Sequence, residues 1–190
     1  QNLNELLQLA AGVDVRQRGA WGMQADVSLR GGTFEQALIL VNGVKMNDPQ
    51  TGHHNLNLGI SPLNIERIEV IKGPAASRYG LNSFSGVINI VTKPSDDNQV
   101  EIRTAMMQSA GENFLSDKNG GYLVDASINF GAKKTRHNIA VNRTQSTGYR
   151  SNTDFIRQQV FYQGTTEKTK VGQFGAMASY LDNNFGASGF

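Results

Sequence analysis

The chain has 190 residues and a net charge of +2, with 18 basic and 16 acidic side chains and no cysteine. Because the two signs are interspersed, no basic stripe forms, and nucleic acid is not expected as a partner. The absence of cysteine excludes disulfides, thiolate zinc sites and cysteine nucleophiles. No apolar run approaches the roughly 18 residues of a membrane-spanning helix, but the alternating strands of a membrane barrel are compatible with 21 glycines and a hydrophilic average.

The first predicted element is a helix over Asn2 to Gly12. Its apolar face consists of Leu3, Leu6, Leu7 and Ala10. Asn2 and Glu5 have the spacing of a capping box, and Gly12 lies where such a helix ends. This helix needs a neighbour that covers its apolar face.

Short segments rich in β-branched residues follow, each bounded by glycine, asparagine, aspartate or proline. The predicted strands are Val13 to Gln17, Val27 to Arg30, Ala37 to Val41, Glu66 to Lys72 and Val87 to Thr92. Pro62 and Pro74 each stand where a single helical turn would begin. We therefore predict a compact α+β domain, residues 1–94, with a small mixed sheet and short helices. The polar stretch Lys93 to Asn98 marks its boundary.

The second half, residues 99–190, changes to a two-residue period, which is typical of strands with one apolar face. The even-numbered residues of Tyr122 to Phe130 and of Phe174 to Tyr180 are apolar or aromatic. We predict that they face lipid and that Asp125, Asn129 and Gln173 face the lumen of a barrel. Weaker strands are predicted near 99–108, 137–147 and 155–164, for a total of about five.

Long connections at 109–121 and 146–154 alternate with short ones at 133–136 and 165–169. This alternation suits antiparallel hairpins with long loops outside the membrane and tight turns inside. A soluble meander with one buried face would show the same alternation. The aromatic residues at the ends of both clear strands favour the membrane barrel, whose interfaces carry aromatic girdles.

Five blocks of the first half then carry a resemblance to a known family. They read LNELLQLAAGVDV, SLRGG, ALILVNGV, IERIEVIKGPAASRYG and GVINIVTK. In this order and spacing they resemble the plug domain of TonB-dependent outer-membrane receptors, and the match covers Leu3 to Lys93. The resemblance implies a plug inside a barrel of 22 strands, so we expect this chain to be a truncated part of a receptor whose TonB-binding segment lies upstream.

The resemblance also implies a function. Such receptors import a scarce nutrient across the bacterial outer membrane with energy delivered by TonB and its inner-membrane complex, and they need no cofactor. Lys72-Gly73-Pro74 is more similar to receptors for siderophores, haem or cobalamin than to the glycan importers of the same superfamily. A glycan importer or a non-transporting adhesive or structural β-protein remains the alternative. The expected partners are TonB, outer-membrane lipid and a small nutrient ligand.

Two loops are candidates for ligand binding, because the equivalent loops of the family face the extracellular vestibule. They span 19–23 and 46–57, and the candidate residues are Trp21, His53, His54 and Asn55. Solvated loops, with Trp21 packed on the barrel wall, are the alternative. His53 and His54 are adjacent, so on an extended chain their rings point apart, and no third ligand has metal-binding spacing.

Four charged residues are candidates for polar contacts between plug and barrel. The resemblance assigns Arg30 and Lys72 to carboxylates of the barrel wall. Arg67 and Glu69 share one face of a strand, and they either join that interface or pair with each other. Asn42 and Lys72 depart from the aspartate and arginine that the family commonly shows. A turn tolerates asparagine, but lysine lacks the bidentate fork of arginine.

The sequence shows no recognisable motif of a catalytic Ser-His-Asp triad. Its aspartates and glutamates also show no spacing typical of a catalytic carboxylate pair. The glycines of residues 73–80 are not followed by the Gly-Lys-Ser/Thr of a phosphate loop. We therefore expect no enzyme.

Overall fold

The computed structural model describes residues 2–17, 25–47, 55–92, 97–108, 120–148 and 152–186. The chain divides into two compact units. The first comprises Gln1–Leu58 and Asn64–Lys93, and the second comprises Gly59–Leu63 and Pro94–Phe190. Among the described residues, no helix has the length and apolar character needed to cross a membrane.

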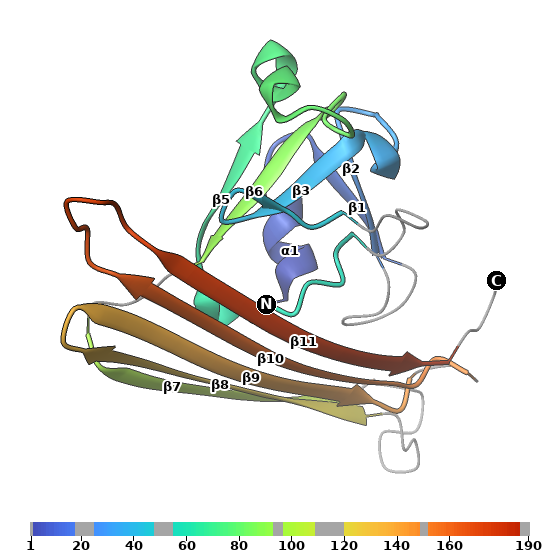
Figure 1. Cartoon of the computed structure of the whole chain (residues 1–190). Helices are drawn as coiled ribbons and strands as arrows, with labels where there is room; N and C mark the ends of the chain where they lie inside the picture. Colours follow the sequence, from blue (N-terminus) through green and yellow to red (C-terminus); the bar gives the residue numbers. More distant parts are fainter. Residues whose placement is uncertain are drawn as a thin grey trace. The chain divides into compact units, whose positions relative to one another are not determined.

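In its described residues, the first unit contains one α-helix, two 3-10 segments with the last residue of a third, and two small sheets (Figure 1). The helical elements are α1 (Leu3–Gln8), η1 (Phe34–Gln36), η2 (Pro62–Asn64), whose last residue belongs to this unit, and η3 (Gly73–Tyr79). Strands β1 (Val13–Gln17) and β2 (Ala25–Leu29) form an antiparallel pair. The other sheet has the order β4-β3-β6-β5, with β3 (Ala37–Val41), β4 (Val44–Lys45), β5 (Ile65–Ile71) and β6 (Gly86–Thr92). Since β3 and β6 are parallel and the other pairs antiparallel, the predicted small mixed sheet is confirmed.

Strand β3 lies at the centre of this core. All five of its residues are buried, as its unbroken apolar sequence ALILV predicts for a strand covered on both faces. Leu38 and Leu40 pack with Val87 and Ala76, and the opposite face of the two strands buries Ile39, Val41, Ile88 and Ile90. Each fully buried aliphatic side chain of this kind contributes about 1.5–3 kcal/mol.

The helix and the second strand end earlier than the sequence predicted. The capping box of Asn2 and Glu5 is present, but α1 stops at Gln8 instead of Gly12. The chain then turns through Gly12, whose φ of +76° suits glycine, directly into β1. Arg30 was predicted as the last residue of a strand, but it has a φ of +52° and lies in the turn after β2. Its backbone conformation therefore belongs to the turn and not to a strand.

The second unit contains five long antiparallel strands in the order β11-β10-β9-β8-β7, which lie side by side in Figure 1. They are β7 (Gln99–Gln108), β8 (Gly120–Ala132), β9 (Thr135–Ser146), β10 (Phe155–Thr166) and β11 (Gly175–Phe185). Each strand pairs with its neighbours in sequence, so the sheet is a meander. The five predicted strands are confirmed. Strand β11 begins one residue after Phe174, so Gln173 and Phe174 belong to the preceding connection and not to a face of the sheet.

The two faces of this sheet differ as the alternation predicted. Val124 and Ile128 of β8 are exposed, and Asp125 and Ser127 between them are buried. We call the face of Val124 and Ile128 the outward face. Its large exposed apolar residues are Val100, Ile102, Met106, Val124, Ile128, Ile139, Val141, Val160 and Tyr180. The opposite, inward face is rich in amides, hydroxyls and charges.

Adjacent residues of β7 offer a direct test of the predicted lipid-facing and lumen-facing sides in the protein reconstituted in lipid vesicles. Ile102 is 68% exposed on the outward face, and Glu101 points to the inward face. An outward arginine near the bilayer midplane costs about 2–4 kcal/mol. We expect Ile102→Arg to lower the free energy of unfolding in denaturant by this amount and Glu101→Arg to lower it much less. Equal losses would contradict the assignment. Ser127 would be a poor control, because the structure buries it.

Candidate functional site

Arg30 and Lys72, which are far apart in the sequence, lie beside the same glycine turn. The backbone N–H of Arg30 donates to the carbonyl of Gly12 over 2.9 Å, and Lys72 Nζ donates to the carbonyl of Ala11. A Cβ added to Gly12 would lie 3.3 Å from Lys72 Nζ and 3.7 Å from Arg30 Cγ. Both charged side chains are exposed. We call this arrangement of Gly12, Arg30 and Lys72 the Gly12 corner, and it presents two cations on one patch of the first unit.

Arg67 and Glu69, on the charged face of β5, pair with each other. Arg67 Nε lies 2.8 Å from Glu69 Oε1, and a second nitrogen of Arg67 lies 3.1 Å from Glu66 Oε1. Asn89, the neighbour of Glu69 across the sheet, donates from Nδ2 to Glu69 Oε2 over 2.8 Å. The Arg67 side chain is 53% exposed, so this network contributes little to stability by itself. Of the two sequence-based interpretations of this face, the geometry matches the local pair.

These hydrogen bonds shift both pKa values. The pKa of the Glu69 carboxyl is lowered, first by the hydrogen bond from Asn89 and then by that from Arg67. The pKa of Arg67 is raised, chiefly by its hydrogen bond to Glu69. Both charged forms are therefore favoured in the folded state.

A buried polar contact of the second unit joins the segment Gly59–Leu63 to the inward face of the sheet. Ser61 Oγ lies 2.6 and 2.7 Å from the two carboxylate oxygens of Asp125 in β8. Ser61 Oγ also accepts the backbone N–H of Leu63, so its single proton is directed at the carboxylate. Arg103 of β7 donates to Asp125 Oδ2 over 2.8 Å. We call the side chains of Ser61, Asp125 and Arg103 the Asp125 anchor.

The carboxylate of the Asp125 anchor is fully buried, so its polar contacts matter for stability. The Asp125 side chain is 0% exposed and that of Arg103 is 30% exposed. A buried carboxylate is tolerated only where a countercharge and hydrogen bonds replace water. Gly59, two residues before Ser61, fits against β11, where an added Cβ would lie 2.9 Å from Cβ of Ser179. The segment Gly59–Leu63 therefore contacts the sheet at β8 and at the edge strand β11.

A row of polar side chains continues from the anchor across the inward face. Asn142 is the neighbour of Asp125 in β9, and Gln159 is the neighbour of Asn142 in β10. Gln159 Nε2 and Thr144 Oγ1 donate to Asn142 Oδ1 over 3.1 and 3.2 Å. These side chains are buried. These inward side chains thus hydrogen-bond to one another, and Asp125 lies on the inward face, which is the side that the sequence predicted for it.

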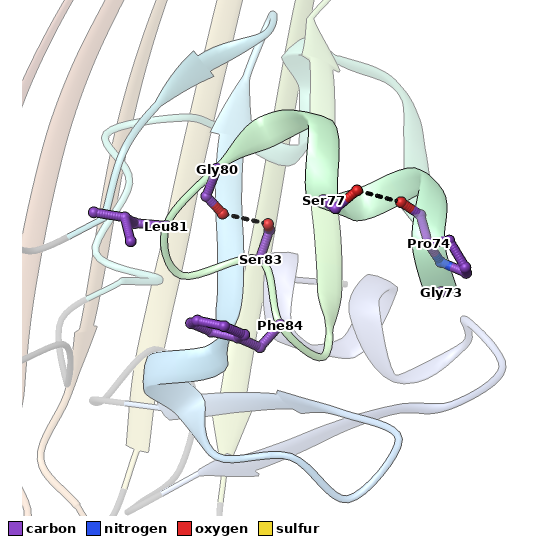
Figure 2. A pocket seen from close by; sticks show the side chains of 7 residues that line it. All are labelled: Gly73, Pro74, Ser77, Gly80, Leu81, Ser83 and Phe84. Carbon is purple, nitrogen blue, oxygen red and sulfur yellow. Dashed lines mark hydrogen bonds between the residues drawn. The ribbon is translucent and has the colours of Figure 1, made fainter.

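The turn after β5 forms an open apolar pocket (Figure 2). Its volume is about 580 Å³, and its lining residues include Pro74, Ser77, Ser83, Leu81 and Phe84. The hydroxyl of Ser77 donates to the carbonyl of Pro74, and the hydroxyl of Ser83 donates to the carbonyl of Gly80. The protons of both hydroxyls are therefore used within the turn. Leu81 and Phe84 are 76% and 81% exposed. This geometry agrees with the sequence-based exclusion of a phosphate loop.

The predicted ligand residues are only partly placed. Trp21, His53 and His54 lie outside the described residues, and Asn55 is 3% exposed. Asn55 was expected on a polar surface loop, but it opens the segment that buries Leu56, Leu58 and Ile60, and it is covered with them. Among the residues that the structure places, no three histidine, aspartate or glutamate side chains gather as metal ligands would.

The turn position and local hydrogen bonding predicted for Asn42 are confirmed. Asn42 has a φ of +50° in the turn between β3 and β4. Its Oδ1 accepts the N–H of Thr92 over 2.9 Å, and its Nδ2 donates to Thr92 Oγ1 over 2.6 Å. Sequence reasoning missed Ser61 and Arg103. The phase of the alternation in β7 relative to β8 could have indicated Arg103, but no local signal marks Ser61.

The Asp125 anchor predicts unequal effects of two substitutions. Asp125→Ala leaves a partly buried guanidinium and a hydroxyl without their acceptor, and breaking such a buried pair costs about 3–5 kcal/mol. We expect the lower end of this range, because Arg103 retains some contact with water. Ser61→Ala removes one hydrogen bond and should cost about 1 kcal/mol. Denaturant unfolding of the protein in detergent measures both, and a cost of Asp125→Ala no greater than that of Ser61→Ala would contradict the anchor.

The Glu69 network predicts an acid-dependent loss of stability. Because the folded-state pKa is lowered, the contribution of Glu69 is complete above its ordinary pKa of 4.5 and disappears as the pH falls through the folded-state value. The Glu69→Gln protein should therefore be less stable than the wild type at pH 6, and the difference should shrink as the pH is lowered below 4.5. Unfolding curves at pH 6 and at acid pH measure the difference, and a difference unchanged at acid pH would refute the assignment.

Comparison with known proteins then identifies the family. The model of the TonB-dependent receptor plug domain matches residues 1–87. A vitamin B12 transporter, BtuB, of Vibrio vulnificus strain YJ016 is 33% identical over 95% of this chain and 32% of its own length. A BtuB of Vibrio cholerae is 31% identical over 78% of this chain and 23% of its own length. The chain thus spans about a third or less of the length of these curated relatives.

Solved structures agree in fold. The unliganded ferric citrate transporter FecA has a TM-score of 0.78 with 19% identity, over 96% of this chain and 28% of that protein. A mutant of the ferric enterobactin receptor PfeA of Pseudomonas aeruginosa has a TM-score of 0.63 with 20% identity, over 96% of this chain and 31% of that protein. The matches extend over both units. The chain therefore belongs to the TonB-dependent receptors, of which it carries the plug domain and antiparallel strands that match their barrels.

Proposed function

We propose that the receptor to which this chain belongs imports a nutrient of the cobalamin class across the bacterial outer membrane. The observation that carries this proposal is the 33% identity with a vitamin B12 transporter over 95% of the chain. That similarity covers the strands as well as the plug, so it extends beyond the motifs that mark every plug. TonB, with its inner-membrane complex, supplies the energy.

The geometry supports import and gives no support to catalysis. The family consists of receptors and transporters. An importer needs a ligand surface and a plug with two arrangements, and both can be made without nucleophiles or general bases. Trp21, His53 and His54 in the two loops are the proposed ligand contacts. Loss of affinity for cyanocobalamin in Trp21→Ala and His54→Ala would support them, and unchanged affinity in both would remove them.

The Asp125 anchor supports a plug that can be released. Ser61 lies within the stretch matched by the plug model, and Asp125 lies in the strands. Their contact consists of hydrogen bonds, which water can replace at small net cost when the two sides separate. An apolar contact of the same area would resist opening. We propose that this contact opens during import.

The siderophore class is the second candidate. FecA and PfeA are named for ferric citrate and ferric enterobactin, but their identity of 19–20% supports a shared fold only. The Lys72-Gly73-Pro74 sequence, which closes β5 and opens η3, argues against the glycan importers of the superfamily. An adhesive or structural role has less support, because the relative with 33% identity is a transporter.

Uptake by a deletion strain separates these candidates. The strain lacking the receptor, with and without the full-length gene restored, is given radiolabelled cyanocobalamin, ferric citrate or ferric enterobactin. We expect the restored gene to raise uptake of cyanocobalamin at least tenfold, and a deletion of TonB to abolish the gain. Uptake of an iron chelate alone would overturn the cobalamin assignment. No gain with any of the three would count against this nutrient class.

The Gly12 corner carries the proposed contact between plug and wall carboxylates. Arg30→Ala removes a guanidinium that can make two parallel hydrogen bonds, so a buried wall carboxylate would lose its partner at a cost of about 3–5 kcal/mol. Lys72→Ala should cost less, because an ammonium offers a single point charge. Leakage of a large antibiotic through the outer membrane measures loosening of the plug. Wild-type leakage in Arg30→Ala would contradict the role, and Arg16→Ala, on the exposed β1, is the matched control.

A further inference from the structure

The short connections of the second unit carry an excess of positive charge. Residues 133–134, between β8 and β9, and 167–174, between β10 and β11, contain one acidic residue, Glu167, and four lysines: Lys133, Lys134, Lys168 and Lys170. The long connections, 109–119 and 147–154, contain two basic and three acidic residues. Cations therefore gather at the end of the sheet where short turns join the strands. We call the four lysines the basic rim.

The two short connections are held next to each other. The backbone N–H of Glu167 donates to the carbonyl of Lys134 over 2.8 Å. The tip of the second connection is a tight turn, in which the backbone N–H groups of Thr169 and Gly172 each donate to the other residue's carbonyl. All four lysines of the basic rim are exposed. Asp97 lies at the same end but before β7, on the far side of β8. The basic rim is therefore one cationic surface over β9, β10 and β11.

Aromatic side chains of the outward face lie next to this rim. Phe130 of β8 and His137 of β9 are cross-strand neighbours, and their rings stack with centroids 5.0 Å apart. His137 Nδ1 lies 3.0 Å from the hydroxyl oxygen of Tyr162 in β10, and Nε2 lies 3.0 Å from Thr135 Oγ1. Both ring nitrogens are therefore hydrogen-bonded, and the rings can border hydrocarbon without an unpaired polar atom of the imidazole. We call Phe130, His137 and Tyr162 the aromatic cluster.

The order of residues along the outward face matches the layers of a bilayer. Toward the middle of the strands, the next residues are the exposed Ile128 and Ile139, which are cross-strand neighbours. Rings with polar tips suit the boundary between hydrocarbon and headgroups. Lys134 precedes His137 by three residues, which is about 10 Å along a strand, and its flexible side chain can reach part of this distance back. The ammonium groups of the rim would then lie at the depth of the headgroup phosphates.

We propose that the basic rim and the aromatic cluster form a binding site for an anionic phospholipid. The acyl chains lie over Ile128 and Ile139, and the aromatic cluster contacts the glycerol region. Lys134 and Lys168, on either side of the hydrogen bond that joins the two turns, contact the phosphate. Basic clusters at a membrane surface attract anionic lipids, whereas a zwitterionic headgroup adds its own ammonium to the lysines. This site rests on the proposed membrane location of the strands, and it is independent of the imported nutrient.

Native mass spectrometry of the full-length receptor tests the site with two lipids of matched acyl chains. Phosphatidylglycerol has a net negative charge, and phosphatidylethanolamine has none. We expect the wild type to retain phosphatidylglycerol at least threefold more than phosphatidylethanolamine. The double variant Lys134→Gln/Lys168→Gln should retain the two lipids equally, because it removes the charges that contact the phosphate. The double variant Lys134→Arg/Lys168→Arg keeps both charges and should keep the preference.

Arg143→Gln is a second control, since Arg143 is an exposed cation on the same face of β9 but lies toward the long connections. It should also keep the preference. A wild type that does not prefer phosphatidylglycerol, or a preference that survives in Lys134→Gln/Lys168→Gln, would overturn the proposal. Loss of the preference in either control would overturn it as well, because the effect would then not depend on charge at this rim.

Uptake of cyanocobalamin by the same variants is a separate readout. Lipid preference lost in Lys134→Gln/Lys168→Gln with uptake unchanged supports the site independently of the nutrient. A wild type with the expected lipid preference but without cyanocobalamin uptake would count against the proposed function and leave the lipid site supported. The two readouts therefore distinguish failure of this site from failure of the proposed function.

Discussion

A carboxylate without contact to water, that of Asp125, sets the constraint on which the second unit depends. Burial of a charge is costly, so the groups around it must be held in place. Arg103 supplies the countercharge and Ser61 the hydrogen bond, and together they fix the segment Gly59–Leu63 against β8. The two-residue alternation of the strands directs their apolar residues to the other face. The buried ion pair thus accounts for where the segment is held on the inward face.

Charged side chains also lie on the surface of the plug domain. The Arg67–Glu69 network, the Gly12 corner and the Asp125 anchor all consist of groups that water can solvate when their partners withdraw. The apolar core of the first unit is confined to β3, β6 and the elements that pack on them. In the import that we propose, a plug built in this way would keep its own fold while its polar contacts are exchanged.

Much of the fold could be predicted because it depends on local periodicity. The alternation in Tyr122 to Phe130 predicted both the strand and its faces, and the unbroken run Ala37 to Val41 predicted a strand buried on two sides. Element ends were less predictable. Gly12 and Arg30 are in left-handed turns that depend on their contact with each other, and no local pattern encodes it. The partner of Asp125 was also beyond prediction, because Ser61 is 64 residues away and resembles any serine before a proline.

A reversible disulfide between Ser61→Cys and Asp125→Cys, in a chain that otherwise has no cysteine, tests whether this contact opens during the proposed import. The measurement is TonB-dependent uptake of cyanocobalamin, with surface binding recorded on the same cells. Under oxidising conditions, we expect normal binding and an uptake reduced at least tenfold, and reduction of the disulfide should restore uptake. Undiminished uptake with the disulfide fully formed would show instead that this contact stays closed during import.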